Sequence, residues 1–325
     1  MKLAAIDIGT NAVRLQISSV LNVQEQGEKT VKFKKLEYIR FPLRLGTNVF
    51  KNQKITPKKV KKLSKLLRAF KILLKLYKVD ETMICATAAI REAENGKQIV
   101  KHIKDKLGLE IEIITGKDEA DMISKVILNK LDDKNYLHID VGGGSTELNL
   151  YVNKEKVASS SFKIGTVRIL NGKIKPERWE KMEKWIIENV KSDYLPITAI
   201  GTGGSISKIY DLSLEKLNIE TADDNQKLEV GSWQSAVGNQ QQINKTISLD
   251  IIKKVQQYLM RFTEEERINK LMLNPDRADV VIPASKIYLS VMKWAKAEKI
   301  IVPEVGLKDG MIQTLYEKGI GGIRE

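Results

Sequence analysis

The sequence predicts an α/β protein that consists of two similar halves, and three observations support this prediction. Short apolar runs with strand character alternate with longer helical patterns along the chain, as in sheets that are covered by helices. The 325 residues are enough for about two domains of roughly 150 residues each. An offset of 133 residues superimposes two short segments, with Asp7 on Asp140 and Gly9 on Gly142, which indicates a duplication.

Five apolar runs are predicted to form strands. They are residues 4–6, 83–86, 111–114, 136–139 and 197–200. Several of these runs stop at Asp or Gly, which is typical of strands that deliver a loop to a ligand. The repeated segments 6–11 and 139–144 each continue such a run. Each half is therefore predicted to contain a strand, an acidic glycine turn and a returning strand, with the two turns facing one cleft.

The clearest helix prediction covers residues 57–78. Apolar residues recur there at spacings of three and four and so share one face; they are Val60, Leu63, Leu67, Phe70, Leu74 and Tyr77. Pro57 suits the first turn of a helix. Residues 51–78 hold ten Lys and one Arg but no acidic residue. The outer face is therefore either an ordinary solvated surface or a binding surface for a polyanion.

Further helices and one loop are predicted along the rest of the chain. The helices cover residues 97–107, 177–191, 250–263, 283–299 and 311–318, and another begins near Asp118. The polar segment 221–244 is expected to be a surface loop. These helices alternate with the five strands and so complete the α/β pattern.

Composition limits the classes of function. The chain carries 55 Lys and Arg against 41 Asp and Glu, a formal net charge of +14, which attracts polyanions. With 42% apolar residues it is too hydrophobic for a disordered basic tail, and no apolar stretch reaches the roughly 18 residues of a membrane span.

The single cysteine, Cys85, lies in an apolar run and suits a buried thiol in a reducing cytoplasm. Because His-rich metal sites need more imidazoles than the two present, His102 and His138, a metal ion would be held by carboxylates, phosphates and water.

The second acidic glycine turn has the chemistry of a phosphate-binding loop. Glycine lets backbone N–H groups approach phosphate oxygens closely, and Gly142, Gly143 and Gly144 provide this freedom. The hydroxyl groups of Ser145 and Thr146 add two further donors. The aspartates at positions 7 and 140, Asp7 and Asp140, are predicted to hold Mg²⁺ largely through water, with Mn²⁺ as the alternative ion.

Other phosphate-binding motifs fail on spacing. Residues 201–208 lack the Gly-Lys-Ser/Thr ending of a P-loop. Ile206 stands where a dinucleotide fingerprint requires its third glycine. A Rossmann dehydrogenase is therefore disfavoured.

Residues 7–14 and 140–148 resemble the two phosphate motifs of the superfamily that contains acetate and sugar kinases, heat-shock-70 proteins and actin. Further motifs resemble those of the exopolyphosphatase and guanosine pentaphosphate phosphatase (Ppx/GppA) family; they are residues 86–96, 115–120, 162–168, 201–205 and 277–281. The resemblance runs from residue 3 to about residue 316. It implies duplicated actin-like (ribonuclease H-like) domains flanking a central cleft. The first domain is expected to comprise residues 1–117 with a returning C-terminal helix at 306–325, and the second residues 118–305.

The resemblance also implies roles for individual residues. Glu119 matches the family's catalytic carboxylate, which would orient a water molecule and accept its proton. Its neighbour Asp118 fits the role of an acid at a helix start. Glu147 is a second catalytic candidate, for metal or water binding, with a surface ion pair as the alternative. Phosphate binding is expected from Gly9, Thr10, Asn11, Arg14, Arg91, Arg168, Gly203, Gly204 and Ser205.

The function implied by the resemblance is Mg²⁺-dependent release of terminal orthophosphate from inorganic polyphosphate by a cytoplasmic, homodimeric enzyme. Guanosine pentaphosphate is the alternative substrate, although the acid-free basic stretch at 51–78 favours the polymer. A non-catalytic polyanion-binding or nucleic-acid-binding protein would explain the charge but not the two acidic glycine turns. An inactive sensor also stays open, because Ala12 replaces the Ser or Thr common at that place in the family.

Overall fold

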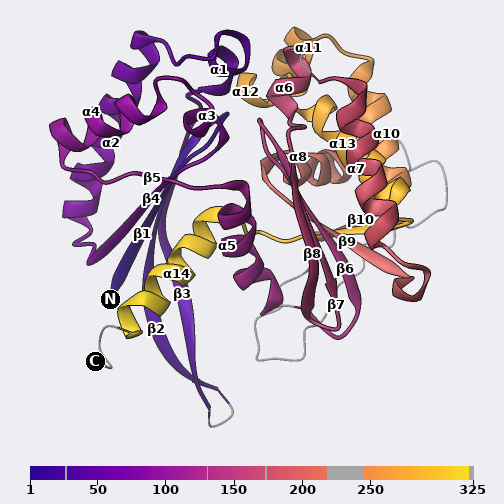
Figure 1. Ribbon diagram of the computed structural model, residues 1–325, viewed down its shortest axis with the longest axis horizontal. Helices are drawn as coiled ribbons and strands as arrows, with labels where there is room; N and C mark the ends of the chain where they lie inside the picture. The colour runs from indigo at the N-terminus through magenta and orange to yellow at the C-terminus, as the bar shows by residue number, and fades with distance from the viewer. Residues whose placement is uncertain (26–27, 130, 173, 218–244, 322–325) are drawn as a thin grey trace. The chain divides into compact units, whose positions relative to one another are not determined.

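The computed structural model describes residues 1–25, 28–129, 131–172, 174–217 and 245–321, and it divides the chain into two compact units (Figure 1). The first unit combines Met1–Ile127 with Gly306–Glu325, and the second is Leu128–Val305. The loop predicted at 221–244 lies outside the described residues. In the part of the chain that is described, no helix is both long and apolar enough to cross a membrane.

The first unit contains a mixed sheet of five strands. They are β1 (Lys2–Ile8), β2 (Val13–Glu25), β3 (Glu28–Phe41), β4 (Glu81–Ala86) and β5 (Glu112–Ile113), in the spatial order β3-β2-β1-β4-β5. β2 runs antiparallel to both β1 and β3, whereas β1, β4 and β5 are parallel. The helices of this unit are α1 (Gly46–Asn52), α2 (Pro57–Leu76), α3 (Ala88–Arg91), α4 (Gly96–Leu107), α5 (Gly116–Leu128) and α14 (Leu307–Gly321).

The second unit contains a mixed sheet of six strands. They are β6 (Asn135–Val141), β7 (Thr146–Val152), β8 (Glu155–Phe162), β9 (Ile197–Thr202), β10 (Lys245–Ser248) and β11 (Lys299–Val302), in the order β10-β11-β9-β6-β7-β8. Its helices are α6 (Thr166–Leu170), α7 (Pro176–Asn189), α8 (Gly204–Leu212), α10 (Leu249–Met260), α11 (Glu264–Asn269), α12 (Pro275–Ala278) and α13 (Val281–Trp294). Two shorter helical turns are Ser192–Tyr194 and Ser213–Leu217.

The sequence repeat is also a repeat of strand pairing. In the first unit Asp7 of β1 lies opposite Arg14 of β2, and in the second unit Asp140 of β6 lies opposite Glu147 of β7, again 133 residues on. The order β3-β2-β1-β4-β5 recurs as β8-β7-β6-β9-β11, with the same strands antiparallel and parallel. The predicted duplicated α/β fold is therefore confirmed.

Helix α2 shows how the apolar spacing becomes packing. Leu63, Leu67, Phe70 and Leu74 are buried on one face, as the pattern predicts, and the helix ends at Leu76.

The predicted C-terminal end of the helix at residues 283–299 is wrong. α13 stops at Trp294, because residues 299–302 form β11 and pair with β9 and β10 instead.

Helix α14 belongs to the first unit and packs there against α5. A Cβ atom at Gly310 would overlap the backbone of Met122, so the two helices approach as closely as glycine allows. Lys125 of α5 forms an ion pair with Glu317 of α14 at 2.5 Å. These contacts group α5 with the first unit, so the unit boundary lies after Ile127, whereas the sequence places it after residue 117.

Candidate active site

Three parallel strands of the first unit bring predicted site residues to one edge of its sheet. The carboxyl ends of β1, β4 and β5 lie together, because Thr87 N–H donates to Ile8 O at 3.2 Å and Ile114 N–H donates to Ala86 O at 3.1 Å. Asp7 stands at the end of β1, Arg91 follows β4, and Glu119 follows β5. Ligands of open α/β sheets bind at this edge.

Asp7 and Arg14 form an ion pair on this edge. Arg14 Nη1 lies 2.5 Å from Asp7 Oδ2, and the Asp7 side chain is 7% exposed against 25% for Arg14. The two residues are direct cross-strand neighbours, which places both side chains on one face of the sheet. In the structure, the charge of the Asp7 carboxylate is therefore balanced by a guanidinium of the same hairpin.

The thiol of Cys85 lies among the acidic groups of this edge. Cys85 is buried and pairs with Asp7 across β1 and β4. Burial, together with the negative charges of Glu112, Asp7 and Glu119, raises the pKa of the Cys85 thiol to about 12. The thiol therefore stays protonated and unreactive at neutral pH. The same electrostatic influence shows that Asp7 and Glu119 both lie near this residue.

Glu119 lies in the first turn of α5, and its neighbours hold that turn. Asp118 Oδ2 accepts hydrogen bonds from the Thr115 N–H at 2.8 Å and the Thr115 hydroxyl at 2.7 Å, which lowers the pKa of Asp118. The prediction that Asp118 is a helix-start acid is confirmed by these contacts. Arg91 Nη1 donates to Ile114 O at 2.7 Å, so its guanidinium lies beside the same turn. Glu119 is half-buried and directly follows the turn that these hydrogen bonds hold.

The turn at residues 9–12 is the first of the two repeated turns. Gly9 N–H donates to Ala12 O at 3.1 Å, and in the second unit Gly142 N–H donates to Ser145 O at 2.9 Å, so both turns close in the same way. Loop 43–46 supports the first turn, because backbone N–H groups of this loop donate to the carbonyl oxygens of Thr10 and Asn11. The predicted phosphate-binding residues 9–11 thus lie in one hydrogen-bonded turn.

The glycine turn of the second unit has its carbonyl groups bound to α6. Backbone N–H groups at the start of α6 donate to Gly142 O at 3.1 Å and to Gly143 O at 3.0 Å, and Arg168 Nε donates to Gly144 O at 2.8 Å. Since the C=O and N–H of a trans peptide point in opposite directions, the N–H groups of residues 143–145 point away from α6. Three successive N–H groups on one side form a donor set that suits phosphate oxygens.

Arg168 and Thr146, both predicted phosphate ligands, stabilise this donor set in the structure. Arg168 is 7% exposed and bonds to the turn through its Nε. The hydroxyl of Thr146 donates to Ile164 O at 2.7 Å, which ties the start of β7 to the chain before α6. Gly165 lies against the turn itself, because a Cβ atom there would lie 2.5 Å from Gly144 C.

Asp140 and Glu147 are cross-strand neighbours, so their carboxylates lie on the same face of the second sheet. Glu147 is 1% exposed and accepts a hydrogen bond from the Ser161 hydroxyl at 2.8 Å. The alternative of a surface ion pair for Glu147 is therefore wrong. The described residues contain no cluster of three or more His, Cys, Asp or Glu side chains with metal-binding geometry. Two neighbouring carboxylates fit Mg²⁺, which binds one or two carboxylates and takes its other ligands from water and phosphate.

The loop after β9 completes the edge of the second sheet. Gly203 has φ +97°, and a Cβ atom there would lie 3.2 Å from Asp140 Oδ1, so this position requires glycine. A Cβ atom at Gly204 would overlap the Arg277 guanidinium. Ser205 is buried in the first turn of α8. Arg277 therefore places a cation beside this loop. The sequence analysis does not single out this residue, although residues 277–281 are one of the motifs that carry the family resemblance.

A chain of polar groups, exposed at Ser159 and buried at its other members, crosses the second sheet to this loop. Ser159 donates to Asn149 Oδ1 at 2.8 Å, Asn149 Nδ2 lies 3.0 Å from His138 Nδ1, and His138 Nε2 lies 2.8 Å from the Thr202 hydroxyl. Tyr288 donates to Thr202 O at 2.7 Å. Because an amide nitrogen donates only, Nδ1 of the imidazole is the acceptor and Nε2 carries the proton. His138 therefore has the structural role that its apolar strand predicts.

This network predicts an acid-sensitive fold. Burial lowers the pKa of His138 from 6.5 to about 3. Between these pH values the unfolded chain binds a proton that the folded chain does not, so stability falls as pH falls through 6.5. The contribution of this one group is at most about 1.4 kcal/mol per pH unit.

Urea unfolding as a function of pH measures this effect. His138→Gln removes the titrating group, and we expect the variant to be less stable at neutral pH but to lose less stability than the wild type on acidification. Equal pH slopes for the two proteins would contradict the prediction.

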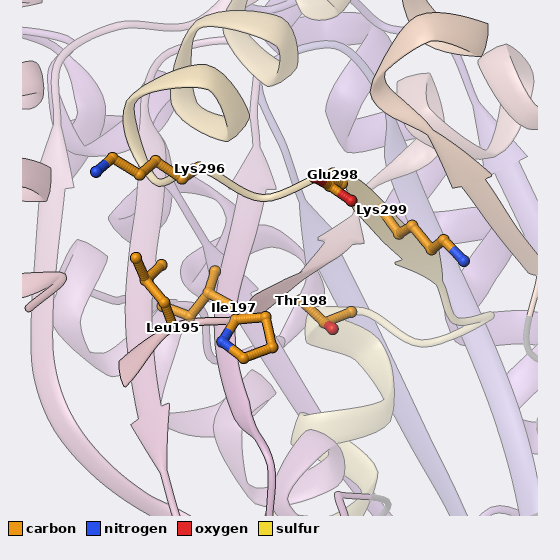
Figure 2. Close-up of a pocket in the computed structure, with 7 residues that line it drawn as sticks. Leu195, Ile197, Thr198, Lys296, Glu298 and Lys299 are labelled. Carbon is orange, nitrogen blue, oxygen red and sulfur yellow. The ribbon is translucent and has the colours of Figure 1, made fainter. Parts of the chain in front are cut away.

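The structure also contains a pocket at the opposite edge of the second sheet. Figure 2 shows it at the start of β9 and β11, where Lys296 and Lys299 extend in opposite directions. Its lining residues are Leu195, Pro196, Ile197, Thr198, Lys296, Glu298 and Lys299. Gly203 follows the other end of β9, so none of the predicted site residues belongs to this pocket.

The sequence profile of the Ppx/GppA phosphatase family matches residues 22–318. The chain is 29% identical to a bifunctional 3-dehydroquinate synthase/phosphatase of Fusobacterium nucleatum over 97% of its own length, but the match covers 46% of that protein. The chain thus spans less than half the length of this relative. It is 21% identical to exopolyphosphatase 1 of Mycobacterium tuberculosis, with 96% of the chain and 87% of that protein covered.

Two further similarities concern a second kind of relative and a solved structure. The chain is 23% identical to a guanosine-5'-triphosphate,3'-diphosphate pyrophosphatase of Photobacterium profundum, over 97% of the chain and 59% of that protein. The crystal structure of an exopolyphosphatase from Cytophaga hutchinsonii matches with a TM-score of 0.74 at 22% identity, covering 98% of both chains. This likeness shows a shared fold.

Proposed function

The chain belongs to the Ppx/GppA phosphatase family, and we propose that it is an exopolyphosphatase, which releases terminal orthophosphate from inorganic polyphosphate by hydrolysis. The observation that carries the proposal is the donor set of residues 143–145 beside the carboxylates of Asp140 and Glu147. Backbone donors suit the oxygens of a phosphate chain, and the carboxylates suit a divalent cation that accompanies such a chain. The net charge of +14 supports a polyanionic substrate.

The proposed reaction is in-line hydrolysis at the terminal phosphorus. The N–H groups of residues 143–145 bind the phosphate oxygens, and the cations Arg14, Arg91 and Arg277 neutralise the charge that spreads over them. Glu119 orients a water molecule and accepts its proton while the water oxygen bonds to phosphorus and the bridging P–O bond breaks. Orthophosphate then leaves, and the shortened chain takes up the proton as its new end forms.

A divalent cation is part of the proposal. Mg²⁺, with Mn²⁺ as the alternative, would be held by Asp140 and Glu147, and Asp7 is proposed as a further ligand through water. When bound, the ion neutralises phosphate charge and polarises the phosphoryl group. The chain's own residues position the substrate and the attacking water.

Phosphate release from polyphosphate in the presence of Mg²⁺ tests the proposal. We expect orthophosphate to appear as the first small product, with the remaining polymer shortening from its ends. Release of pyrophosphate or internal cleavage would argue against terminal hydrolysis. Absence of release with every phosphate polymer and nucleotide tried would overturn the enzymatic proposal and favour a binding protein.

The second candidate function is the 5'-phosphatase reaction on guanosine pentaphosphate. The observation that favours it is the 23% identity to the Photobacterium profundum protein named for that nucleotide. The same donors and carboxylates would act on a terminal phosphate in either substrate. Side-by-side kcat/KM values on polyphosphate and guanosine pentaphosphate decide between the two, since the ratio measures differential binding of the transition state.

A further inference from the structure

The N-terminus of α2 lies beside the loop that supports the first turn. Lys59 donates a short hydrogen bond from Nζ to the carbonyl oxygen of Arg44, and the N–H of Arg44 donates to Asn11 O at 2.8 Å. One helical turn further along α2, Lys62 Nζ lies 5.9 Å from the centroid of the Phe41 ring. Two ammonium groups thus lie beside Phe41 and loop 43–46, and the Arg44 guanidinium is near enough to Lys59 to lower the pKa of that lysine.

Three sources of positive potential coincide at this place. The start of α2 carries the positive end of the helix dipole, and its first turn contains no acidic residue. Lys59 is half-buried, and burial together with the charges of Arg44 and Lys62 lowers its pKa to about 8. Lys59 is therefore still mostly charged at neutral pH, and the repulsion within this group costs stability. An anion bound there would remove that cost.

We propose that Arg44, Lys59 and Lys62 form a subsite for the inner phosphates of a polyphosphate chain whose end is bound at the first turn, residues 9–12. The proposal rests on the proposed function and adds a source of preference for long chains. A phosphate chain repeats one negative charge per unit, so a group of three cations around loop 43–46, which supports the first turn, suits a chain that continues past that turn. A short substrate would end before it reached them.

A charge-removing pair of substitutions on α2 tests the subsite against a matched control on the same helix. The test variant is Lys59→Gln/Lys62→Gln. The control is Arg68→Gln/Lys75→Gln, which removes the same charge from two exposed positions further along α2. We expect the test variant to raise KM for long-chain polyphosphate about tenfold, with KM for tripolyphosphate within about twofold of wild type. The control is expected to match the wild type on both substrates.

A direct binding measurement separates this proposal from the proposed function. Fluorescence anisotropy of labelled long-chain polyphosphate in the presence of a metal chelator reports binding without turnover. Weaker binding by the test variant than by the control, in a protein that releases no phosphate, would uphold the subsite and overturn the proposed function. Equal binding by both variants would overturn the subsite whatever the activity.

Two further measurements distinguish the subsite from a disturbed loop and from a nucleic-acid surface. Lys62→Gln alone keeps the hydrogen bond from Lys59 to the loop, so a binding loss in this single variant does not result from the loss of that bond. We expect it to weaken long-chain binding by about threefold. If duplex DNA lost affinity in these variants and polyphosphate did not, the cluster would be a nucleic-acid surface and the proposal would be wrong.

Discussion

Glu119→Gln is expected to lower kcat for phosphate release by about 10²-fold to 10⁴-fold while the protein stays folded. Glutamine has nearly the same size and still fits the half-buried position in the first turn of α5. The backbone hydrogen bond from the residue 119 N–H to Thr115 O, 3.1 Å long, is unaffected by the change. What the variant loses is the carboxylate that is proposed to accept the proton of the attacking water.

The neighbouring acid provides a matched control. Asp118 bears the same charge, but its carboxylate accepts hydrogen bonds from Thr115 and so stabilises the start of α5. Asp118→Asn is therefore expected to lower stability by about 1 kcal/mol with kcat close to that of the wild type. Initial rates at saturating substrate and the urea midpoint separate the two effects. If Glu119→Gln kept the wild-type rate, or Asp118→Asn lost as much activity, the role of Glu119 would be refuted.

The duplicated fold could be predicted because its signal is local. Each repeated segment joins a buried strand to a glycine turn and a second strand, and hairpin register follows from the turn, so matching residues occupy matching places in both units. Asp7 opposite Arg14 and Asp140 opposite Glu147 follow directly from that register. The end of α13 could not be predicted in this way. Residues 299–302 join a sheet whose other strands are distant in sequence, and periodicity does not contain that information.

The residue types of the candidate site could be predicted from the sequence. Which of these residues face a ligand and which hold the main chain in place could not. Glycine, serine and aspartate at a strand end indicate a phosphate loop, but the sequence does not show which groups face away from α6. Arg168 and Thr146 bond to main-chain carbonyl oxygens, a role that depends on the path of residues 162–168. Arg277 meets Gly204 only because α12 packs near the start of α8, a contact between segments more than 70 residues apart.

Gly165→Ala is expected to disrupt the second turn more than any other single methyl group added near it. The backbone of Gly165 is extended, with φ −149°, so an alanine could adopt its conformation, and only the space around it forbids a side chain. The added Cβ atom would lie 2.5 Å from Gly144 C and 2.6 Å from Gly143 C and O. All these atoms are backbone, so no flexible side chain can move aside and the turn itself must shift.

That shift acts on stability and turnover through the same atoms. Moving Gly143 lengthens the hydrogen bonds from α6 to its carbonyl oxygen, and we expect a loss of about 2 kcal/mol in the free energy of unfolding. It also turns the N–H groups of residues 143–145 away from the position proposed for the phosphate, which should lower kcat about 10²-fold, as the loss of one preorganised donor does in other enzymes. Gly306→Ala is the control, because nothing lies within 4 Å of a Cβ atom there and Gly306 N–H keeps its bond to Asp309. Calorimetry and rates under fully folded conditions measure both effects. A Gly165→Ala protein with unchanged stability and kcat would mean that the turn retreats freely, and a turn that does so cannot supply the preorganised donors on which the proposed reaction depends.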